Sequence, residues 1–458
     1  MKNPKFPVRS LGLALATALL WCAAAPAQTP PPPQAASEDR IEQLEREVAA
    51  LRAAIAELAK PEAPVQVAAD RLAEVESKID VLAAEIEKLK IGEAAVAADQ
   101  SDQGMGPAAS KIYRTERGVS IGGYGEAIYQ KFDDSRDDGR PSGRTDSADL
   151  LRAVVYFGYK WNDRLLFNSE VEFEHGGEEV GVEFAYLDYL WKPQANLRGG
   201  LLLVPMGFVN ELHEPTVFHG AKRPDVERQI LPSTWRENGF GLYGDVGPIT
   251  YRTYVLNGFD ASGFTAAGLR GGRQNGSEAK AERFAWVGRA DYAATPGLLA
   301  GLSAYVGKAG QGDGAGVGTR IVEGHVEWKR NGFELRALGV QADLDDVARL
   351  NGELGLAGNR SIGERLTGGY LQAAYDLFTL FPQSEQALAP FARFESFDTQ
   401  DRVPSGFAKN PANDVDVLTL GLTYKPIPQM VFKLDYQDYE NGADTGVDQV
   451  NLAFGYVF

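Results

Sequence analysis

The chain has 458 residues, including 51 Gly, 22 Phe and 18 Tyr, and its formal net charge is −17 at pH 7. A chain this acidic lacks the basic face that a general binder of nucleic acid or of anionic membrane surfaces needs, so no nucleic-acid partner is expected. Its mean hydropathy of −0.26 is ordinary for a soluble protein, but a barrel with a polar lumen averages to a similar value. Composition therefore favours one large β architecture over two or three ordinary domains.

The amino terminus, residues 1–27, has the three parts of a secretory signal peptide. Three basic residues precede the apolar run 11–20, and Ala-Pro-Ala at 25–27 offers the small residues that a signal peptidase reads. Removing this segment would also remove Cys22, the only cysteine. A lipid-anchoring role for Cys22 is the alternative, although Trp21 is unlike the small residue that precedes such anchors. No later run of about 18 apolar residues exists, so any membrane crossing is expected to use β-strands.

A Pro-rich spacer, 28–37, leads into residues 38–92, where apolar side chains recur at alternating spacings of three and four. This is an a/d heptad seam, interrupted at Lys60-Pro61 and resumed in a shifted phase, so it predicts a coiled coil in two segments. Ile or Val at a with Leu at d favours two strands. The next residues, 93–117, are rich in Ala and Gln and are interpreted as a linker. The seam consists of Ile41, Leu44, Val48, Leu51, Ile55 and Leu58, and then of Leu72, Val75, Ile79, Leu82, Ile86 and Leu89.

From 118 to 458 the apolar period becomes two. In one clear run, Phe167, Val171 and Phe173 alternate with Glu170 and Glu172, so one face is apolar and the other charged. Long polar connections alternate with tight turns, as on the two rims of outer-membrane barrels. We therefore predict an all-β fold: a 16-stranded antiparallel transmembrane β-barrel with a water-filled lumen and an N-terminal helical coiled-coil stem. The runs begin near residues 118, 148, 163, 181, 196, 238, 249, 282, 298, 319, 332, 366, 390, 416, 429 and 448.

The longest irregular segment of this domain is 205–238. A connection of that length in a compact unit is usually functional or disordered. It keeps apolar side chains such as Phe208, Phe218 and Trp235, too many for a solvated tail. We predict that it folds into the mouth of the barrel as a constriction loop.

The sequence around this loop resembles a known family. The strand at 199–208, the segment 227–232 (Glu-Arg-Gln-Ile-Leu-Pro) and the strand at 236–243 resemble the phosphate-selective porin (O/P) family and its relatives that carry other small anions. The terminal Phe458 is similar to the carboxy-terminal assembly signal that the barrel-insertion machinery of Gram-negative bacteria recognises. The resemblance covers roughly 118–458. It implies a homotrimer in the outer membrane, surrounded by lipid and lipopolysaccharide, with the coiled coil as a three-stranded periplasmic stem rather than the two-stranded one favoured above.

The resemblance also implies that Arg and Lys in the eyelet select anions, and guanidinium groups suit small anions through paired donors and a fixed charge. Acidic residues on the same strand faces support an alternative, a general diffusion porin with a mixed-charge eyelet. The constriction candidates are His213, His219, Lys222, Arg223, Arg228 and Arg236. The pore-wall candidates are Arg152, Arg252, Arg289, Arg336, Arg393 and Lys433, together with Glu170 and Glu172.

Catalysis and metal binding are not expected from the spacing of residues along the chain. Glu211-Leu-His-Glu214, followed by His219, matches no established zinc motif, and none of the four histidines stands in a convincing context for a Ser nucleophile. No catalytic residue, metal or cofactor is therefore predicted. A structural role remains the other alternative, in which the stem tethers the outer membrane to peptidoglycan and the barrel is its anchor.

Overall fold

The computed structural model describes residues 46, 49, 98, 100–312, 316–381 and 384–458. The predicted signal peptide, spacer and nearly all of the predicted coiled coil lie outside the described residues. Arg46 and Ala49, the two described residues of that region, are helical and exposed. A second unit of the chain extends from Ala94 to Phe458 and is described by itself below. Among the described helices, none has the length and apolar character needed to cross a membrane.

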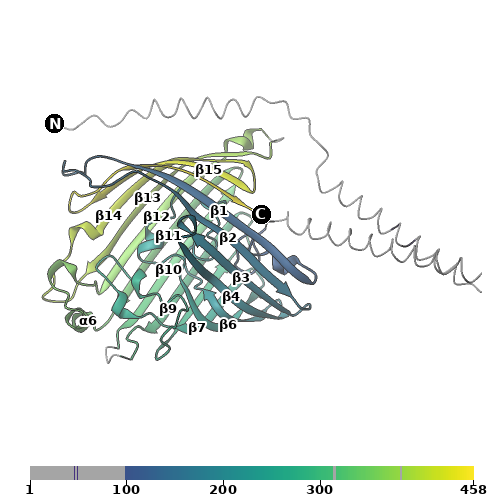
Figure 1. Ribbon diagram of the computed structural model, residues 1–458, viewed down its shortest axis with the longest axis horizontal. Helices are drawn as coiled ribbons and strands as arrows, with labels where there is room; N and C mark the ends of the chain where they lie inside the picture. Colours follow the sequence, from purple (N-terminus) through teal and green to yellow (C-terminus); the bar gives the residue numbers. More distant parts are fainter. Residues whose placement is uncertain (1–45, 47–48, 50–97, 99, 313–315, 382–383) are drawn as a thin grey trace, which may run out of the picture. The chain divides into compact units, whose positions relative to one another are not determined.

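This second unit is a closed antiparallel barrel of sixteen strands in which each strand pairs with its neighbours in sequence and β1 pairs with β16 (Figure 1). The prediction of fold class is confirmed for the barrel, and each strand begins within three residues of its predicted start. The strands are β1 Gly118–Phe132, β2 Ser147–Lys160, β3 Leu165–Glu174, β4 Glu179–Lys192, β5 Ala195–Leu203, β6 Arg236–Val246, β7 Ile249–Asn257, β8 Phe284–Tyr292, β9 Leu298–Lys308, β10 Gly318–Arg330, β11 Phe333–Leu344, β12 Arg365–Tyr375, β13 Ala387–Arg402, β14 Asp414–Ile427, β15 Met430–Asn441 and β16 Gln449–Val457.

Short helices occupy the connections and the segment before β1. The α-helices are α4 Lys111–Arg114, α5 Val226–Gln229 and α6 Val347–Glu353, and the 3-10 helices are η1 His175–Gly177, η2 Ala261–Gly263, η3 Arg270–Gly272, η4 Gly358–Arg360, η5 Leu377–Leu380 and η6 Pro411–Asn413. The connection between β12 and β13, long for its rim, holds η5.

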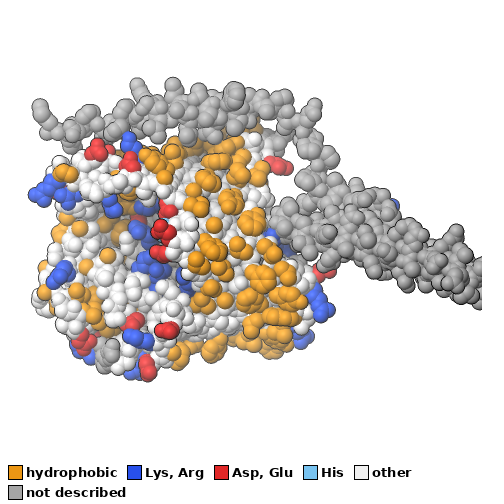
Figure 2. Space-filling model, viewed as in Figure 1, with side chains coloured by type: hydrophobic (Ala, Val, Ile, Leu, Met, Phe, Trp, Pro, Cys, Tyr) orange, Lys and Arg blue, Asp and Glu red, His pale blue; other side chains and the backbone are white. Residues whose placement is uncertain are grey.

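The strands present apolar side chains to the outside and polar ones to the lumen. In β10, Val322 and Val326 are 58% and 44% exposed, whereas Glu323 and His325 between them are at most 2% exposed. Figure 2 shows apolar side chains gathered over the part of the wall that β1 to β4 form in Figure 1. This pattern is the inverse of a soluble sheet, because here hydrocarbon is the outer solvent, and it identifies a transmembrane β-barrel.

The carboxy terminus closes the barrel against β1. The backbone N–H of Phe458 donates to the carbonyl oxygen of Gly123 at 2.9 Å, and the N–H of Gly123 donates back at 3.1 Å. A Cβ added at Gly123 would lie 2.3 Å from the carbonyl oxygen of Val154 and 2.7 Å from the Phe458 ring. Glycine at this position therefore lets the terminal ring lie flat over the seam.

We expect Gly123→Ala to destabilise this seam, because the added methyl group forces backbone or ring to shift, at a cost of roughly 1–3 kcal/mol. Urea unfolding of the refolded barrel measures the effect. Gly339→Ala is the matched control, since a Cβ there meets nothing within 4 Å. A Gly123→Ala barrel as stable as the control would contradict this account of the seam.

Two long connections on one rim fold into the lumen. The first joins β5 to β6 and covers residues 204–235, close to the predicted 205–238; most of its side chains are buried. The second joins β7 to β8, covers 258–283 and meets the first where the rings of Trp235 and Phe259 stack at 4.5 Å. We call the first of these the constriction loop. Its buried aromatic side chains hold it inside the barrel instead of above it.

The segment before β1 also lies in the lumen. Of the predicted linker 93–117, the described part folds into a turn and helix α4, and Met105, Ala109 and Ile112 are at most 2% exposed. The N–H groups of Ala108 and Ala109 donate to the carboxylate of Glu214 in the constriction loop at 3.0 and 3.2 Å. This part of the chain therefore differs from a solvated linker and belongs to the barrel unit. We call residues 100–117 the plug segment.

Candidate functional site

Wall residues fasten the backbone of the constriction loop. Arg289 donates to the carbonyl oxygen of Gly207, and Arg393 donates to that of His219 at 3.3 Å. On the same side of the barrel, the carboxylate of Glu395 accepts the N–H of Val226 at 3.1 Å. The loop lacks regular secondary structure over most of its length, so these charged groups satisfy backbone atoms that would otherwise be buried without partners.

The six basic wall candidates all face the lumen and are nearly buried, but carboxylates compensate most of their charges. One of these ion pairs joins Arg336 and Glu327. The ammonium group of Lys433 lies 3.5 Å from the centre of the Phe218 ring and has no hydrogen-bond partner among the residues that the structure describes. The other separations are 3.0 Å for Arg152 and Glu126, 2.7 Å for Arg252 and Asp291, 2.8 Å for Arg289 and Asp291, and 2.8 Å for Arg393 and Glu395.

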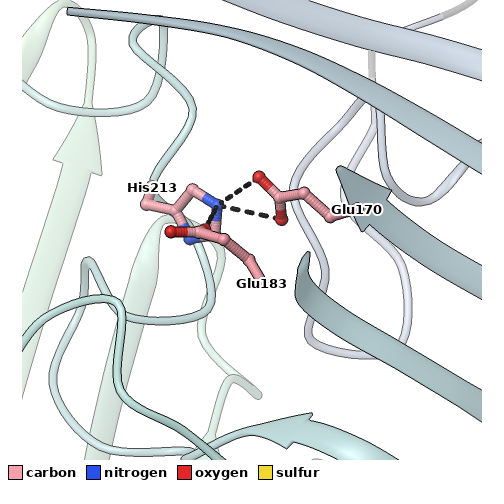
Figure 3. Close-up of side chains that lie close together, drawn as sticks. All are labelled: Glu170, Glu183 and His213. Atoms are coloured by element: carbon pink, nitrogen blue, oxygen red, sulfur yellow. Dashed lines mark hydrogen bonds and ion pairs between the residues drawn. The ribbon is translucent and has the colours of Figure 1, made fainter. Parts of the chain in front are cut away.

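The histidines of the constriction loop contact acidic wall residues. Nε2 of His213 lies 3.1 Å from a carboxylate oxygen of Glu170 on β3 and 3.1 Å from one of Glu183 on β4 (Figure 3). Burial opposes the protonated form, but Glu170 and Glu183 outweigh it and raise the pKa of His213 to about 9. His219 lies 3.7 Å from the carboxylate of Glu334.

The four basic candidates of the loop and of β6 differ in how fully they are paired. Arg228 forms an ion pair with Asp225 at 2.6 Å. Arg236 lies 3.8 Å from Glu172 and 3.7 Å from Glu183, and so bridges β6 to the acidic wall. Lys222 lies 5.7 Å from the ring centre of Tyr439. Arg223 donates only to a backbone carbonyl oxygen, that of His213, at 3.5 Å.

Two further arginines, from the connection after β7, join this group. Arg270 and Arg273 donate to the carbonyl oxygen of Ser233 at 2.7 and 2.8 Å. Burial lowers the pKa of Arg270, and the positive charges of Arg273, Arg223 and Arg228 lower it further, so these three side chains lie within electrostatic reach of Arg270. We call Arg223, Arg228, Arg270 and Arg273 the arginine cluster.

The arginine cluster is oriented by backbone oxygens more than by acids. Within the described chain, Arg223, Arg270 and Arg273 form no ion pair with a carboxylate, and Arg228 alone has one. All four are partly accessible. The sequence did not lead to Arg270 and Arg273, because their strand parity is undefined in a Gly-rich loop; the one sign of them is the Arg-Gly-Gly-Arg at 270–273.

Below the constriction loop, open space lies on one side of the lumen. A cavity of about 310 Å³ lies between residues 216–219 of the loop and the walls β10 to β14, and Lys329, Glu334 and Lys425 line it. On the other side, the plug segment contacts β3, where Asn168 donates to the carbonyl oxygen of Ala109 at 3.0 Å. This cavity therefore lies against β10 to β14, whereas the plug segment contacts β3.

A related protein sequence places the chain in a family, although no family model matches the chain. A protein of Aquifex aeolicus (strain VF5), described as "Uncharacterized protein", is 42% identical over 362 residues, which cover 75% of this chain and 81% of that protein. The chain belongs to the same family as this Aquifex aeolicus protein. The likeness to the phosphate-selective porin family stays a prediction.

Three solved structures are similar in architecture. The anion-selective porin from Comamonas acidovorans is 12% identical with a TM-score of 0.49, and the match covers 75% of this chain and all of that one. The outer membrane channel DcaP of Acinetobacter baumannii is 13% identical with a TM-score of 0.49 over 74% and 97% of the two chains. Salmonella typhi OmpF, in complex with daunomycin, is 13% identical with a TM-score of 0.49 over 76% and 99%. Scores below 0.5 add nothing to what the strand pairing shows.

Proposed function

We propose that this protein is an outer-membrane porin, a water-filled channel for the passive uptake of small hydrophilic solutes, and that it prefers anions such as phosphate or carboxylates. Sixteen strands that close into one barrel enclose a lumen too wide for wall side chains alone to fill. The exposed apolar band and polar interior are those of barrels that sit in an outer membrane. The proposal gives the chain no enzymatic role.

The observation that carries the preference for anions is the arginine cluster. Three of its four guanidinium groups form no ion pair with a carboxylate among the described residues, and fixed positive charge in a narrow passage raises the local concentration of anions. Backbone oxygens hold Arg270 and Arg273 in place, so their remaining donors can bind a passing phosphate or carboxylate in pairs. The formal charge of −17 does not oppose this, because groups farther away than about 8 Å are largely screened.

The reversal potential of single channels in planar lipid bilayers tests this proposal. Under a KCl gradient we expect the sign that indicates a higher permeability for Cl⁻ than for K⁺. The preference should weaken as the salt concentration rises, because screening shortens the reach of the cluster. A clear preference for K⁺ would contradict the proposal.

A general diffusion porin is the second candidate, and the acidic wall favours it. Glu170, Glu172 and Glu183 are buried on β3 and β4, facing the constriction loop, and Arg236 lies between them and the cluster. An acidic wall opposite a basic cluster produces an electric field across the lumen but selects only weakly between cations and anions. Block of Cl⁻ current by millimolar phosphate separates the two candidates, since a general pore would show none.

The assembly and partners of the channel are part of the same proposal. We infer a homotrimer surrounded by lipid and lipopolysaccharide, inserted by the barrel-insertion machinery through a signal that includes Phe458. The coiled coil 38–92 would extend into the periplasm, where contact with peptidoglycan is the tether alternative. Conductance and oligomeric state of a chain that lacks 28–93 distinguish the two: a conducting trimer makes the stem accessory, and a silent full-length barrel favours the tether.

A further inference from the structure

We propose that Glu170, Glu183 and His213 form a binding site for a divalent metal ion, and that Zn²⁺ fits its donors best. The three side chains come from three separate elements, namely β3, β4 and the constriction loop, and each is at most 2% exposed. One donor atom from each lies within 4.8 Å of the other two. The proposal does not depend on what the channel carries.

The distances suit a shared ion. Nε2 of His213 is 3.1 Å from the nearer oxygen of Glu170 and 3.1 Å from the nearer oxygen of Glu183, and Figure 3 shows both carboxylates turned towards the ring. Ligand atoms about 2.0–2.2 Å from a tetrahedral ion are separated from one another by roughly this distance. One imidazole and two carboxylates are a donor set that Zn²⁺ accepts, and a fourth position would remain for water.

The imidazole is oriented as metal ligands usually are. Nδ1 of His213 lies 2.8 Å from the carbonyl oxygen of Asn210, so it carries a proton and donates it there. This contact fixes the ring with Nε2 towards the two carboxylates, so an ion that displaces the proton on Nε2 would meet the usual outer arrangement around a metal-bound histidine.

His325, the other deeply buried histidine, shows the contrast. Its Nδ1 faces Glu323 at 2.7 Å, and its Nε2 faces Asp291 at 2.8 Å. Each ring nitrogen thus meets a carboxylate of its own, and a protonated ring satisfies both. At His213, two carboxylates converge on one nitrogen, which a single N–H cannot serve equally.

Polar atoms without hydrogen bonds provide the second observation. Within the described chain, neither buried carboxylate oxygen of Glu183 makes a hydrogen bond, and its partners there are the ion pairs with His213 at 3.1 Å and Arg236 at 3.7 Å. The buried hydroxyl of Tyr124, whose ring centre lies 6.0 Å from that of His213, makes no hydrogen bond to the described residues either. Buried polar groups normally make hydrogen bonds or bind metal. An ion with one bound water would satisfy Glu183 and offer Tyr124 a hydrogen bond.

The competing occupant of the site is a proton on Nε2, which would make His213 an imidazolium ion between two acids. Arg236, 3.7 Å from Glu183, favours an imidazolium ion because it already neutralises part of the acidic charge, and Arg152 and Arg223 act on Glu183 in the same direction. Arg152 is itself paired with Glu126 at 3.0 Å, and the buried Glu172 adds negative charge beside Arg236, so part of this positive charge is offset. The two occupants differ in a measurable way, since only one of them can be exchanged for Zn²⁺.

A metal at this site would tie the constriction loop to the wall. His213 is in the loop and Arg223 of the arginine cluster donates to its carbonyl oxygen, so the ion would fix the position of the cluster relative to β3 and β4. Removing the ion would free the loop from two strands at once.

Zinc content after dialysis tests the proposal. The full-length protein, without a polyhistidine tag, is incubated with ZnSO₄ in detergent, dialysed against zinc-free buffer and measured by mass spectrometry. We expect one Zn²⁺ per chain in the wild type. We expect the zinc affinity of His213→Gln and of the isosteric Glu183→Gln to fall at least about 100-fold, because each loses a ligand.

His325→Gln and His175→Gln are the matched controls and should retain the zinc of the wild type; His175 is an exposed histidine 2.6 Å from Asp149. Retention unchanged in His213→Gln, or no zinc retained by the wild type, overturns the proposal. If the variants do not fold, the wild type alone is tested with Co²⁺ and its visible absorption spectrum is recorded. Co²⁺ bands that disappear when Zn²⁺ is added support the site, and the absence of such bands overturns it.

Discussion

Replacing Arg223 and Arg270 together by glutamine is expected to abolish the preference for anions. At a distance of about 7 Å between a guanidinium group and a permeating ion, and with an effective dielectric constant between those of water and of a protein surface, the Coulomb energy is roughly 1 kcal/mol per charge. The same charge attracts Cl⁻ and repels K⁺, so removing two should lower the Cl⁻/K⁺ permeability ratio by at least about tenfold. The shift of the single-channel reversal potential under a KCl gradient measures this ratio.

The control must remove an equal charge outside the passage. Arg320→Gln combined with Arg330→Gln does so, because both arginines are exposed near the ends of β10. A matching shift in this control would mean that the whole surface, and not the arginine cluster, sets selectivity. Both arginines of the double variant lie in connections and donate to backbone carbonyl oxygens, those of His213 and Ser233, so heat-dependent gel mobility should show a normally folded barrel.

The remaining basic candidates should matter to different extents. Arg228 already has Asp225 as a partner, so its neutralisation changes the local field less than that of Arg223. Arg236 is paired with the acidic wall, and its loss would leave Glu172 and Glu183 less compensated. The effect of each substitution on selectivity should therefore depend on how strongly that arginine is paired with acidic residues.

The barrel was predictable because a wall that separates hydrocarbon from water imposes strict alternation on every strand. Val322 faces outwards and Glu323 faces the lumen because of their positions along β10, and no distant residue is needed to predict this. The inward direction of Arg252, Arg336 and Lys433 follows from the same alternation. What each inward side chain pairs with does not, because the partner can come from a loop whose path has no period.

The plug segment and the proposed metal site show why the rest could not be predicted. Residues 93–117 have the composition of a linker, and contacts with distant residues such as Glu214 and Asn168 determine where part of them lies. Zinc motifs are recognised by spacing within one segment, whereas Glu170, Glu183 and His213 come together only after the loop folds inward. The spacing of Glu211-Leu-His-Glu214 argued against a motif, and the same His213 acquires its neighbours from β3 and β4.

The largest effect on stability is expected for Arg198→Gln, on the lumen face of β5 beside β4. Arg198 on β5 holds Asp188 on β4 through two hydrogen bonds of 2.9 and 3.0 Å, and both side chains are at most 3% exposed. The rings of Tyr186 and Tyr243 lie 4.3 and 4.4 Å from the guanidinium carbon. Loss of the cation leaves a buried carboxylate without its charge partner, at a cost of about 3–5 kcal/mol. Urea unfolding of the barrel refolded into lipid vesicles measures that cost.

Two further variants show whether the buried charge is the cause. Arg198→Gln combined with Asp188→Asn should cost less than the sum of the two single changes, by about 0.5–3 kcal/mol, because it leaves no lone charge. Arg365→Gln removes the partner of Asp343 at 2.8 Å, where both side chains are about one third exposed, and should cost at most about 1 kcal/mol. Strict additivity of the two buried changes would assign the loss to packing instead.

The same change should loosen the plug segment, because Tyr113 of α4 is held by this pair. The Tyr113 hydroxyl donates to Asp188 at 2.7 Å and accepts from Arg198 at 2.6 Å. Without Arg198, the hydroxyl keeps one of these two contacts, and the segment can leave the lumen more often. We therefore expect larger or noisier single-channel conductance in Arg198→Gln, and the milder Tyr113→Phe should change conductance in the same direction with a smaller loss of stability. If both variants conduct as the wild type does, the plug segment does not limit the passage.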